Sequence, residues 1–346
     1  MEVLRGDGVT KSNEKVFASV KQMPILLHNR EFLFKNIYRK NKDESIQVAT
    51  NSMPVKEKID YGKRMSTVRA TTKILFTATN IQNVGDIPQC RISFNQYFDL
   101  RGFIPVGIFH SKTKSSLKAM KGLKDSFQRD NDVDKRELDR VADIIRNEEQ
   151  DYNEQEETII TQGKEFFKKV TESTHFDELE SPDHRVNMKS VHVDGESLVF
   201  GLCTTTVDAT LEECVAYDYK KGTREKLGRL KKKGVVQQEV VELNEHSQLY
   251  LNVRNLKVPL LSHRDWRSKC IWQKEDGGKK AWSIYDETDE LDKKFPTKEG
   301  NVRAAGRTTW LFEAISQRDQ KEGKAEAVPQ TRATMVYRVD TKGEQL

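Results

Sequence analysis

Histidine and cysteine are the side chains of this sequence best suited to catalysis or metal binding, and their spacing argues against both. The cysteines, Cys90, Cys203, Cys214 and Cys270, include no C-x-x-C pair that would indicate a zinc site or a disulfide framework. The sequence also lacks a G-x-S-x-G elbow, a phosphate-binding loop and an H-E-x-x-H motif. No two of the seven histidines stand at the spacing of metal ligands: His28, His110, His175, His184, His192, His246 and His263. We therefore expect no enzyme activity, no metal and no cofactor.

Two arginines could bind a ligand instead. Arg69 and Arg303 each lie between a valine and an alanine in strand-like surroundings, and the fork of donors of a guanidinium can hold a phosphate or hydroxyl group. The alternative is a solvated arginine on the outer face of a sheet, and we favour it because arginine is almost never fully buried unless it is paired. Arg30 and Arg264 each stand next to an acid, and we expect them to form structural ion pairs.

The run Lys220–Lys233 contains eight basic residues and one acid. A solvated loop is the default interpretation. The alternative is peripheral contact with an anionic membrane surface, where each basic residue contributes on the order of 1 kcal/mol. Nucleic-acid binding is not expected, because few aromatic residues are interleaved with the basic ones.

The elements that must position these residues fall into two domains, because 346 residues exceed what one core usually supports. No apolar run approaches the ~20 residues needed to cross a bilayer, and the N-terminus does not resemble a signal peptide, so a cytoplasmic protein is expected. The acidic segment around 125–157 lacks strand patterning, although Leu138, Val141 and Ile145 keep helical spacing. The predicted domains are 1–128 and 151–346, joined by an acidic, helical linker at 129–150.

The region after the linker begins with an amphipathic helix over 156–173. Asp194-Gly195 predicts a two-residue type I′ hairpin turn, and Thr210 with Glu213 has the spacing of a capping box. Strand candidates then follow one another at 235–243, 247–256, 268–275, 280–287, 307–315 and 333–340. This order predicts an α+β domain with one antiparallel sheet.

An internal repeat links the two ends of the chain. At an offset of 234 positions, Arg30-Glu31-Phe32 aligns with Arg264-Asp265-Trp266, and Val68-Arg69-Ala70 aligns with Val302-Arg303-Ala304. After one insertion of seven residues, Arg91 aligns with Arg332. Several ordered anchors at one spacing indicate that residues 16–105 and 250–346 are two copies of one structural half.

The second copy, with VPLLSHRDW, VRA and TRATMVYRVDTKG, resembles the START (StAR-related lipid-transfer) domain family of the helix-grip superfamily. The segment TTTVDATLEECVAYDYKKGTREK upstream of it, and CRISFNQYFDLRGFIP with SSLKAMKGLKDSF in the first copy, are also similar to that family. The resemblance implies a curved antiparallel sheet around a C-terminal helix, with a hydrophobic tunnel between them. It also implies that 1–128 is the second half of one such domain and that 151–346 lacks its closing helix, as in a fragment of a longer protein.

The function implied is binding of a lipid or sterol for transfer or sensing, without catalysis. The alternatives are an interaction or scaffold module with a filled core, and a helix-grip enzyme that acts on an apolar ligand. Without the closing helix, Leu249, Trp310 and Tyr337 are expected to face water. The tunnel-lining residues implied by the resemblance, each of which could equally be plain core, are Arg69, Leu249, Leu251, Val253, Trp272, Trp282, Arg303, Trp310, Phe312 and Tyr337.

Overall fold

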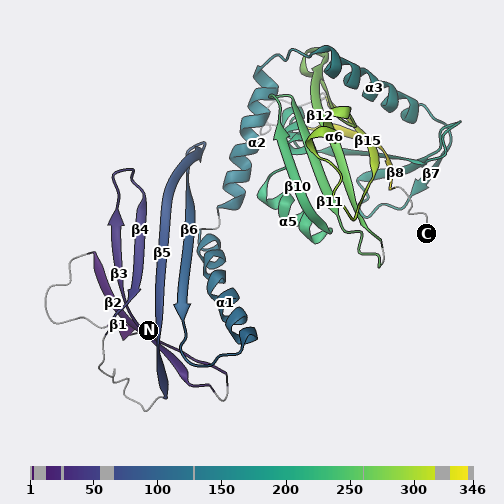
Figure 1. Ribbon diagram of the computed structural model, residues 1–346. Helices are drawn as coiled ribbons and strands as arrows, with labels where there is room; N and C mark the ends of the chain where they lie inside the picture. The colour runs from purple at the N-terminus through teal and green to yellow at the C-terminus, as the bar shows by residue number, and fades with distance from the viewer. Residues whose placement is uncertain are drawn as a thin grey trace. The chain divides into compact units, whose positions relative to one another are not determined.

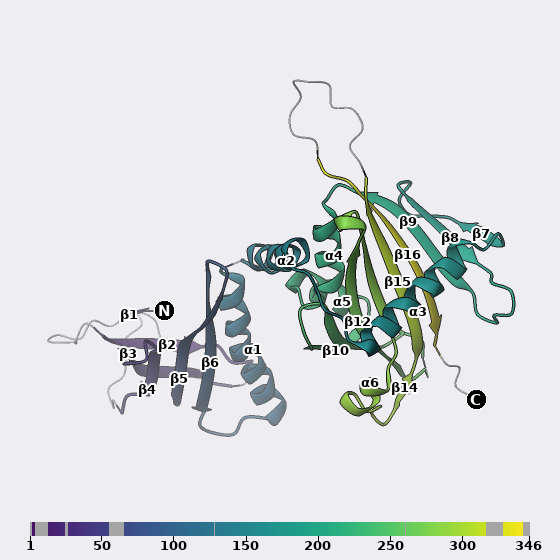
Figure 2. The same ribbon diagram turned by 90° about the horizontal axis from the view of Figure 1, so that it is seen from above.

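The computed structural model describes residues 2–3, 13–24, 27–54, 66–127, 129–259, 261–315 and 328–341. The chain divides into two compact units, Met1–Arg129 and Asp130–Leu346. Each unit contains its own sheet, with a helix beside that of the first unit and several helices against that of the second (Figures 1 and 2). The predicted α+β class with antiparallel sheets is confirmed.

The first unit has a six-stranded sheet in the order β1-β2-β3-β4-β5-β6. Helix α1, Val106–Asp125, follows the last strand and lies beside it (Figure 1). There Ser116 Oγ donates a hydrogen bond to Gln96 Oε1 over 2.5 Å, and the rings of Phe98 and Phe109 are 5.3 Å apart. The strands are β1 Glu2–Val3, β2 Glu14–Lys21, β3 Asn29–Lys40, β4 Ile46–Ser52, β5 Thr67–Val84 and β6 Ile87–Asp99.

The second unit has a ten-stranded sheet in the order β10-β11-β12-β13-β15-β16-β9-β8-β7, with β14 paired to β12. Its strands are β7 Phe176–Leu179, β8 Val186–Val191, β9 Phe200–Val207, β10 Val235–Glu242, β11 Ser247–Arg254, β12 His263–Glu275, β13 Lys280–Asp286, β14 Asn301–Arg303, β15 Ala305–Ala314 and β16 Thr331–Asp340. Its helices are α2 Asp130–Asn147, α3 Glu154–Thr171, α4 Leu211–Tyr219, α5 Arg224–Lys232 and α6 Asp289–Lys294, with the 3₁₀ turn η1 at Asp276–Gly278.

Helix α3 covers one face of this sheet, as the amphipathic pattern predicts (Figure 2). A capping box between Asn153 and Glu156 starts the helix. Its apolar residues pack on Ile271, Ile284 and Trp282. Glycine at 163 permits the close approach, because a Cβ there would lie 2.7 Å from Ile284 Cγ2.

Helices α2 and α4 lie against the opposite face. The capping box predicted for Thr210 and Glu213 is confirmed at the start of α4. Residues 129–150, which the sequence assigns to a linker, contain α2, and its residues Val141 and Ile145 are buried against α4 in the second unit. Apolar spacing within an acidic segment thus marks a packed helix.

The turn predicted at Asp194-Gly195 is wrong in type. Strands β8 and β9 are antiparallel neighbours, but the loop 192–199 joins them, and only Gly195 has a positive φ, of 81°. The backbone N–H of Glu196 donates to the carbonyl of Val193 around that glycine. A two-residue type I′ turn would need positive φ at both central residues.

The two units repeat one local arrangement in the same register. Strand β3 pairs in parallel with β5 through 29–32 and 67–70, and β12 pairs in parallel with β14 through 263–265 and 301–303, an offset of 234. Arg30 Nε donates to the carbonyl of Leu100 over 2.5 Å, and Arg264 Nε donates to the carbonyl of Thr341 over 2.7 Å. The acid beside each of these arginines pairs with a different arginine, because neighbours on a strand point to opposite faces: Glu31 pairs with Arg69 and Asp265 pairs with Arg267.

Candidate functional site

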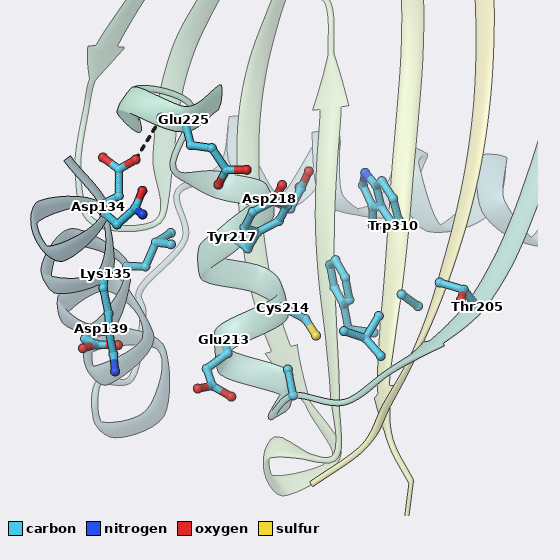
Figure 3. A pocket seen from close by; sticks show the side chains of 16 residues that line it. Asp134, Lys135, Asp139, Thr205, Glu213, Cys214, Tyr217, Asp218, Glu225 and Trp310 are labelled. Atoms are coloured by element: carbon cyan, nitrogen blue, oxygen red, sulfur yellow. Dashed lines mark hydrogen bonds between the residues drawn. The ribbon is translucent and has the colours of Figure 1, made fainter. Parts of the chain in front are cut away.

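A cavity of about 680 Å³ lies in the second unit between α2, α4 and strands β9, β15 and β16 (Figure 3). We call it the apolar cavity. Trp310 and Phe312 from β15 form its wall, stacked with ring centroids 5.6 Å apart and an interplanar angle of 5°. Leu138, Cys214 and Ala333 add apolar surface from α2, α4 and β16. Acidic side chains also line it: Asp134, Asp139, Glu213, Asp218 and Glu225.

A second cavity of about 550 Å³ adjoins the first and shares Tyr217, Asp218 and Trp310 with it. We call it the basic cavity, because Lys221, Lys226, Arg229 and Lys233 line it. Its other walls come from strands β11, β12, β13, β15 and β16, through residues such as Tyr250, Trp266, Tyr285, Thr308 and Val339. Trp310 therefore stands where the two cavities meet.

Asp218 is the centre of a polar network at this junction. Its carboxylate accepts hydrogen bonds from Ser283 Oγ, at 2.6 Å, and from the hydroxyl of Tyr285, and it pairs with Lys221 Nζ at 3.2 Å. Burial alone would raise the pKa of Asp218, but the Lys221 ammonium and the hydroxyl donors hold it below its usual value. Burial, with the nearby Asp218 charge, raises the pKa of Tyr285 well above its usual range. The network is a negative carboxylate with its donors already in place.

Lys226 is the other unusual group. Its Nζ donates to the carbonyls of Lys220, over 3.0 Å, and Tyr217, and it lies 4.1 Å from the centroid of the Tyr217 ring. Burial, followed by repulsion from Lys221, lowers the pKa of Lys226 to about 7. A negative ligand group beside it would favour the charged amine.

Two of the predicted lining residues, Trp310 and Phe312, line the apolar cavity, and three others face the opposite side of the sheet. Leu249, Leu251 and Val253 pack with Leu291 and Phe295 around α6. Leu249 is only 1% exposed, so the expectation that it faces water is wrong. The intervening residue of β11, Tyr250, lines the basic cavity, and alternation along a strand then turns its neighbours away.

The remaining aromatic candidates are dispersed. Trp272 is fully buried in the core beneath α2 and α4, where its indole N–H donates to the carbonyl of Glu245 over 3.0 Å. Trp282 lies on the α3 face and donates to the Glu275 carboxylate over 2.7 Å. Tyr337 is 38% exposed, as expected, and its ring covers Gly201.

Arg69 and Arg303 line neither of these cavities. Arg69 Nε donates to the Glu31 carboxylate in the first unit. Arg303 donates to the carboxylate of Asp292 and, over 2.9 Å, to Thr297 Oγ1. Both guanidinium groups are partly buried and paired with a carboxylate, and Arg303 lines a separate cavity of about 150 Å³ together with Arg267 and Asp292.

Sequence reasoning missed the polar side chains of α4 and α5. Tyr217 and Asp218 come three and four residues after Cys214, and Lys221 comes three residues after Asp218, which places these side chains on one side of a helix and of the turn after it. That spacing was the available signal. Lys226 and Arg229 belong to a run whose default interpretation is a solvated loop, although part of it forms α5.

The first unit contains a smaller cavity of about 220 Å³ on the corresponding face of its sheet. We call it the first-unit cavity. It is lined by Phe32, Phe34, Ile74 and Phe98, among others. At the repeat offset of 234, or 241 after the insertion, these positions correspond to residues that all line the basic cavity: Trp266, Ser268, Thr308 and Val339.

Among the described residues, no cluster of histidine, cysteine, aspartate and glutamate is arranged to hold a metal ion. In that same part of the chain, no helix is both long and apolar enough to cross a membrane. Burial raises the pKa of the Cys214 thiol to about 11 and that of the Cys270 thiol to about 12. Thiols of this kind are protonated and unreactive at neutral pH.

No protein-family model matches the sequence, and no curated protein sequence matches it either. Solved structures do resemble it. Human STARD10 is 17% identical over 59% of this chain and 74% of its own, with a TM-score of 0.38. The human StarD13 (DLC2) lipid transfer and protein localization domain is 20% identical over 57% and 87%, with a TM-score of 0.35. Human StAR-related lipid transfer protein 5 is 14% identical over 55% and 84%, with a TM-score of 0.41.

Proposed function

We propose that the second unit binds a lipid or sterol in the apolar and basic cavities, for transfer or sensing and without catalysis. The observation that carries this proposal is the pair of adjoining cavities of about 680 and 550 Å³, with the stacked Trp310 and Phe312 as a wall. Ligand sites are typically of about 300–1,000 Å³ and mostly apolar, with a few polar groups. The START-like segments of the sequence point to the same ligand class.

The cavities weigh against a scaffold with a filled core. The polar network weighs against catalysis, because the Asp218 carboxylate is held by Lys221, Ser283 and Tyr285 and has a lowered pKa, unlike a general base poised near neutral pH. An enzyme would be indicated by turnover of a ligand that copurifies with the chain.

A tryptophan at Thr205 is the direct test. Thr205 is on β9 and lines the apolar cavity, whereas its exposed neighbour Thr206 does not (Figure 3). Native mass spectrometry with lipid extraction, followed by titration with a fluorescent lipid and a fluorescent sterol, measures occupancy. Thr205→Trp should reduce saturable binding, and Thr206→Trp should leave it unchanged. No saturable binding of any probe to the well-folded parent chain would refute the proposal.

We propose further that the two units are tandem copies and that the first-unit cavity is a second binding site. Three observations support this: the shared register of the parallel strand pairs, the matching arginine bonds to carbonyls, and the cavity-lining residues at equivalent positions. In native mass spectra, the Thr205→Trp chain should keep one bound ligand where the parent holds two. A parent that never exceeds one would contradict the second site.

We also propose that the chain is cytoplasmic and makes peripheral contact with anionic membranes. The C-terminal turn of α5 and the residue after it present exposed Arg229, Lys231, Lys232 and Lys233. Cosedimentation with vesicles rich in anionic lipid should fall with added salt and with the double change Lys231→Glu and Lys232→Glu. Equal binding to neutral vesicles would contradict an electrostatic contact.

A further inference from the structure

The two cavities of the second unit carry opposite charge. The apolar cavity is lined by Asp134, Asp139, Glu213 and Glu225 with Lys135 as its basic residue, apart from the shared Asp218. The Glu213 carboxylate closes the capping box of α4, and the Asp134 carboxylate accepts from the backbone N–H groups of Arg224 and Glu225. The fold holds both acids in place. Asp134 also pairs with the Arg224 guanidinium at 3.4 Å, so Glu213 and Asp139 supply most of the repulsion toward a negative ligand group.

The basic cavity has the reverse balance. Asp218 is its acidic side chain, and Lys221 already neutralises it at 3.2 Å. Lys226, Arg229 and Lys233 remain in excess on the α5 side. Arg229 also lies 3.6 Å from the exposed Glu225, a pair that contributes little at the surface.

A further cation stands behind the wall of this cavity. The Arg254 guanidinium lies 5.5 Å from the Trp266 ring centroid, and Trp266 lines the basic cavity. Arg254 Nε is buried and, among the described residues, has no hydrogen-bond partner. Arg254 does not line the cavity itself, but its charge adds to the positive potential beside Trp266.

We propose that this unit selects an amphiphile with one acidic head group, a carboxylate or a phosphate monoester, whose head lies in the basic cavity and whose hydrocarbon tail lies along Trp310 and Phe312 in the apolar cavity. Trp310 lines both cavities, so one ligand can extend from the basic cavity into the apolar cavity. The acids of the apolar cavity exclude the opposite orientation, because they would face the head group. This inference rests on the proposed lipid binding and adds the chemistry of the head.

The test compares two fluorescent probes with the same tail, a pyrene-labelled long-chain fatty acid and the corresponding alcohol, titrated against the full chain. A hydrogen bond to a charged group contributes more than one to a neutral group, so the acid should bind about tenfold more tightly than the alcohol. The double change Lys226→Met and Arg229→Met should abolish that preference and leave the affinity for the alcohol in place. Lys231→Met with Lys232→Met is the matched control on the same helix, outside the cavity lining, and should keep the preference.

Competitors separate the sources of the anion. Dodecyl phosphate should displace the acid probe, whereas inorganic phosphate should not. Displacement by inorganic phosphate at the same concentration would overturn the proposal in favour of a simple anion site. If the double variant fails to fold, Lys233→Glu at an exposed position should reduce the acid preference instead.

The outcomes distinguish the acidic head group from the proposed lipid binding on which it rests. Equal binding of acid and alcohol, or a preference that survives the double change in the folded protein, overturns the acidic head group and leaves lipid binding intact. Failure of both probes to bind overturns lipid binding itself.

Discussion

Replacing Asp218 by asparagine tests the network at the junction of the cavities. Both hydroxyl donors, of Ser283 and Tyr285, bond to one carboxylate oxygen, Oδ2, whereas Lys221 bonds to the other, Oδ1. An asparagine that keeps its oxygen at the Oδ2 position retains the hydroxyl bonds and turns its NH₂ group toward the ammonium. The change therefore removes the ion pair while it preserves the shape of the site.

The expected loss is large. Removing one partner of a buried ion pair costs about 3–5 kcal/mol, because the other charge stays buried without compensation. The Asp218 and Lys221 side chains remain 14% and 17% exposed, so we expect the lower end of that range. A domain is stable by only about 5–15 kcal/mol, so Asp218→Asn should weaken the second unit severely without unfolding it outright. Adding Lys221→Met should recover most of the loss.

Tryptophan fluorescence measures this unit alone, because all four tryptophans lie in it: Trp266, Trp272, Trp282 and Trp310. Urea denaturation followed in this way gives the free energy of unfolding, with the exposed Glu239→Gln as a control expected to change it by less than about 0.5 kcal/mol.

The pH dependence has a definite sign. The folded-state pKa of Asp218 is lowered, so its contribution is complete at neutral pH and is lost as the pH falls through that pKa, below the usual value of about 3.9. The deficit of Asp218→Asn should therefore shrink in acid. A neutral-pH loss under about 1 kcal/mol, or no recovery on adding Lys221→Met, would refute this account of the network.

Gly163→Ala should destabilise the second unit by about 1–2 kcal/mol, because its Cβ would meet the fully buried Ile284. This figure is the cost of overpacking minus the gain in helix propensity from glycine to alanine. Gly201→Ala should lower the stability by a smaller amount, because the partly exposed Tyr337 ring can move into water. Thermal melts in which Gly201→Ala is the more destabilising change would contradict the packing argument. Burial lowers the pKa of Lys226 from 10.5 to about 7, so between these pH values the folded state binds fewer protons than the unfolded state. The loss of stability from burying Lys226 is therefore complete below pH 7 and disappears toward pH 10.5. Relative to the parent, Lys226→Met should be most favourable near pH 6 and lose that advantage by about pH 10, as read from urea midpoints; a constant difference would contradict the buried charge.

Local patterns were sufficient for the features that depend on near neighbours in sequence. The capping box at Thr210 and Glu213 and the apolar stripe of α3 follow from helix geometry alone, and both are present. The offset of 234 also survives into three dimensions, where β3–β5 and β12–β14 pair in equivalent registers. Each of these signals depends only on spacing along the sequence, so it can be read without knowing which surface the element packs against.

The face on which a strand residue lies depends on that partner surface. Leu249, Leu251 and Val253 alternate as a half-buried strand should, but alternation defines two faces without saying which one meets a cavity, and α6 covers theirs. The same ambiguity misplaced Trp282, which meets α3, whereas Trp310 and Phe312 face the cavity. Covering helices far away in sequence decide such cases.

The sequence by itself determined the α+β class and the main helices and strands of the second unit, because these follow from local periodicity and spacing. Only the tertiary structure decided that Asp218 and Lys226 face a cavity and not bulk water. Helices α4 and α5 pack them against strands β11, β12, β13 and β15. Tertiary structure also decided that the space beneath Trp310 is hollow. A void depends on how side chains from several distant segments fill one volume, and no spacing along the chain records that volume.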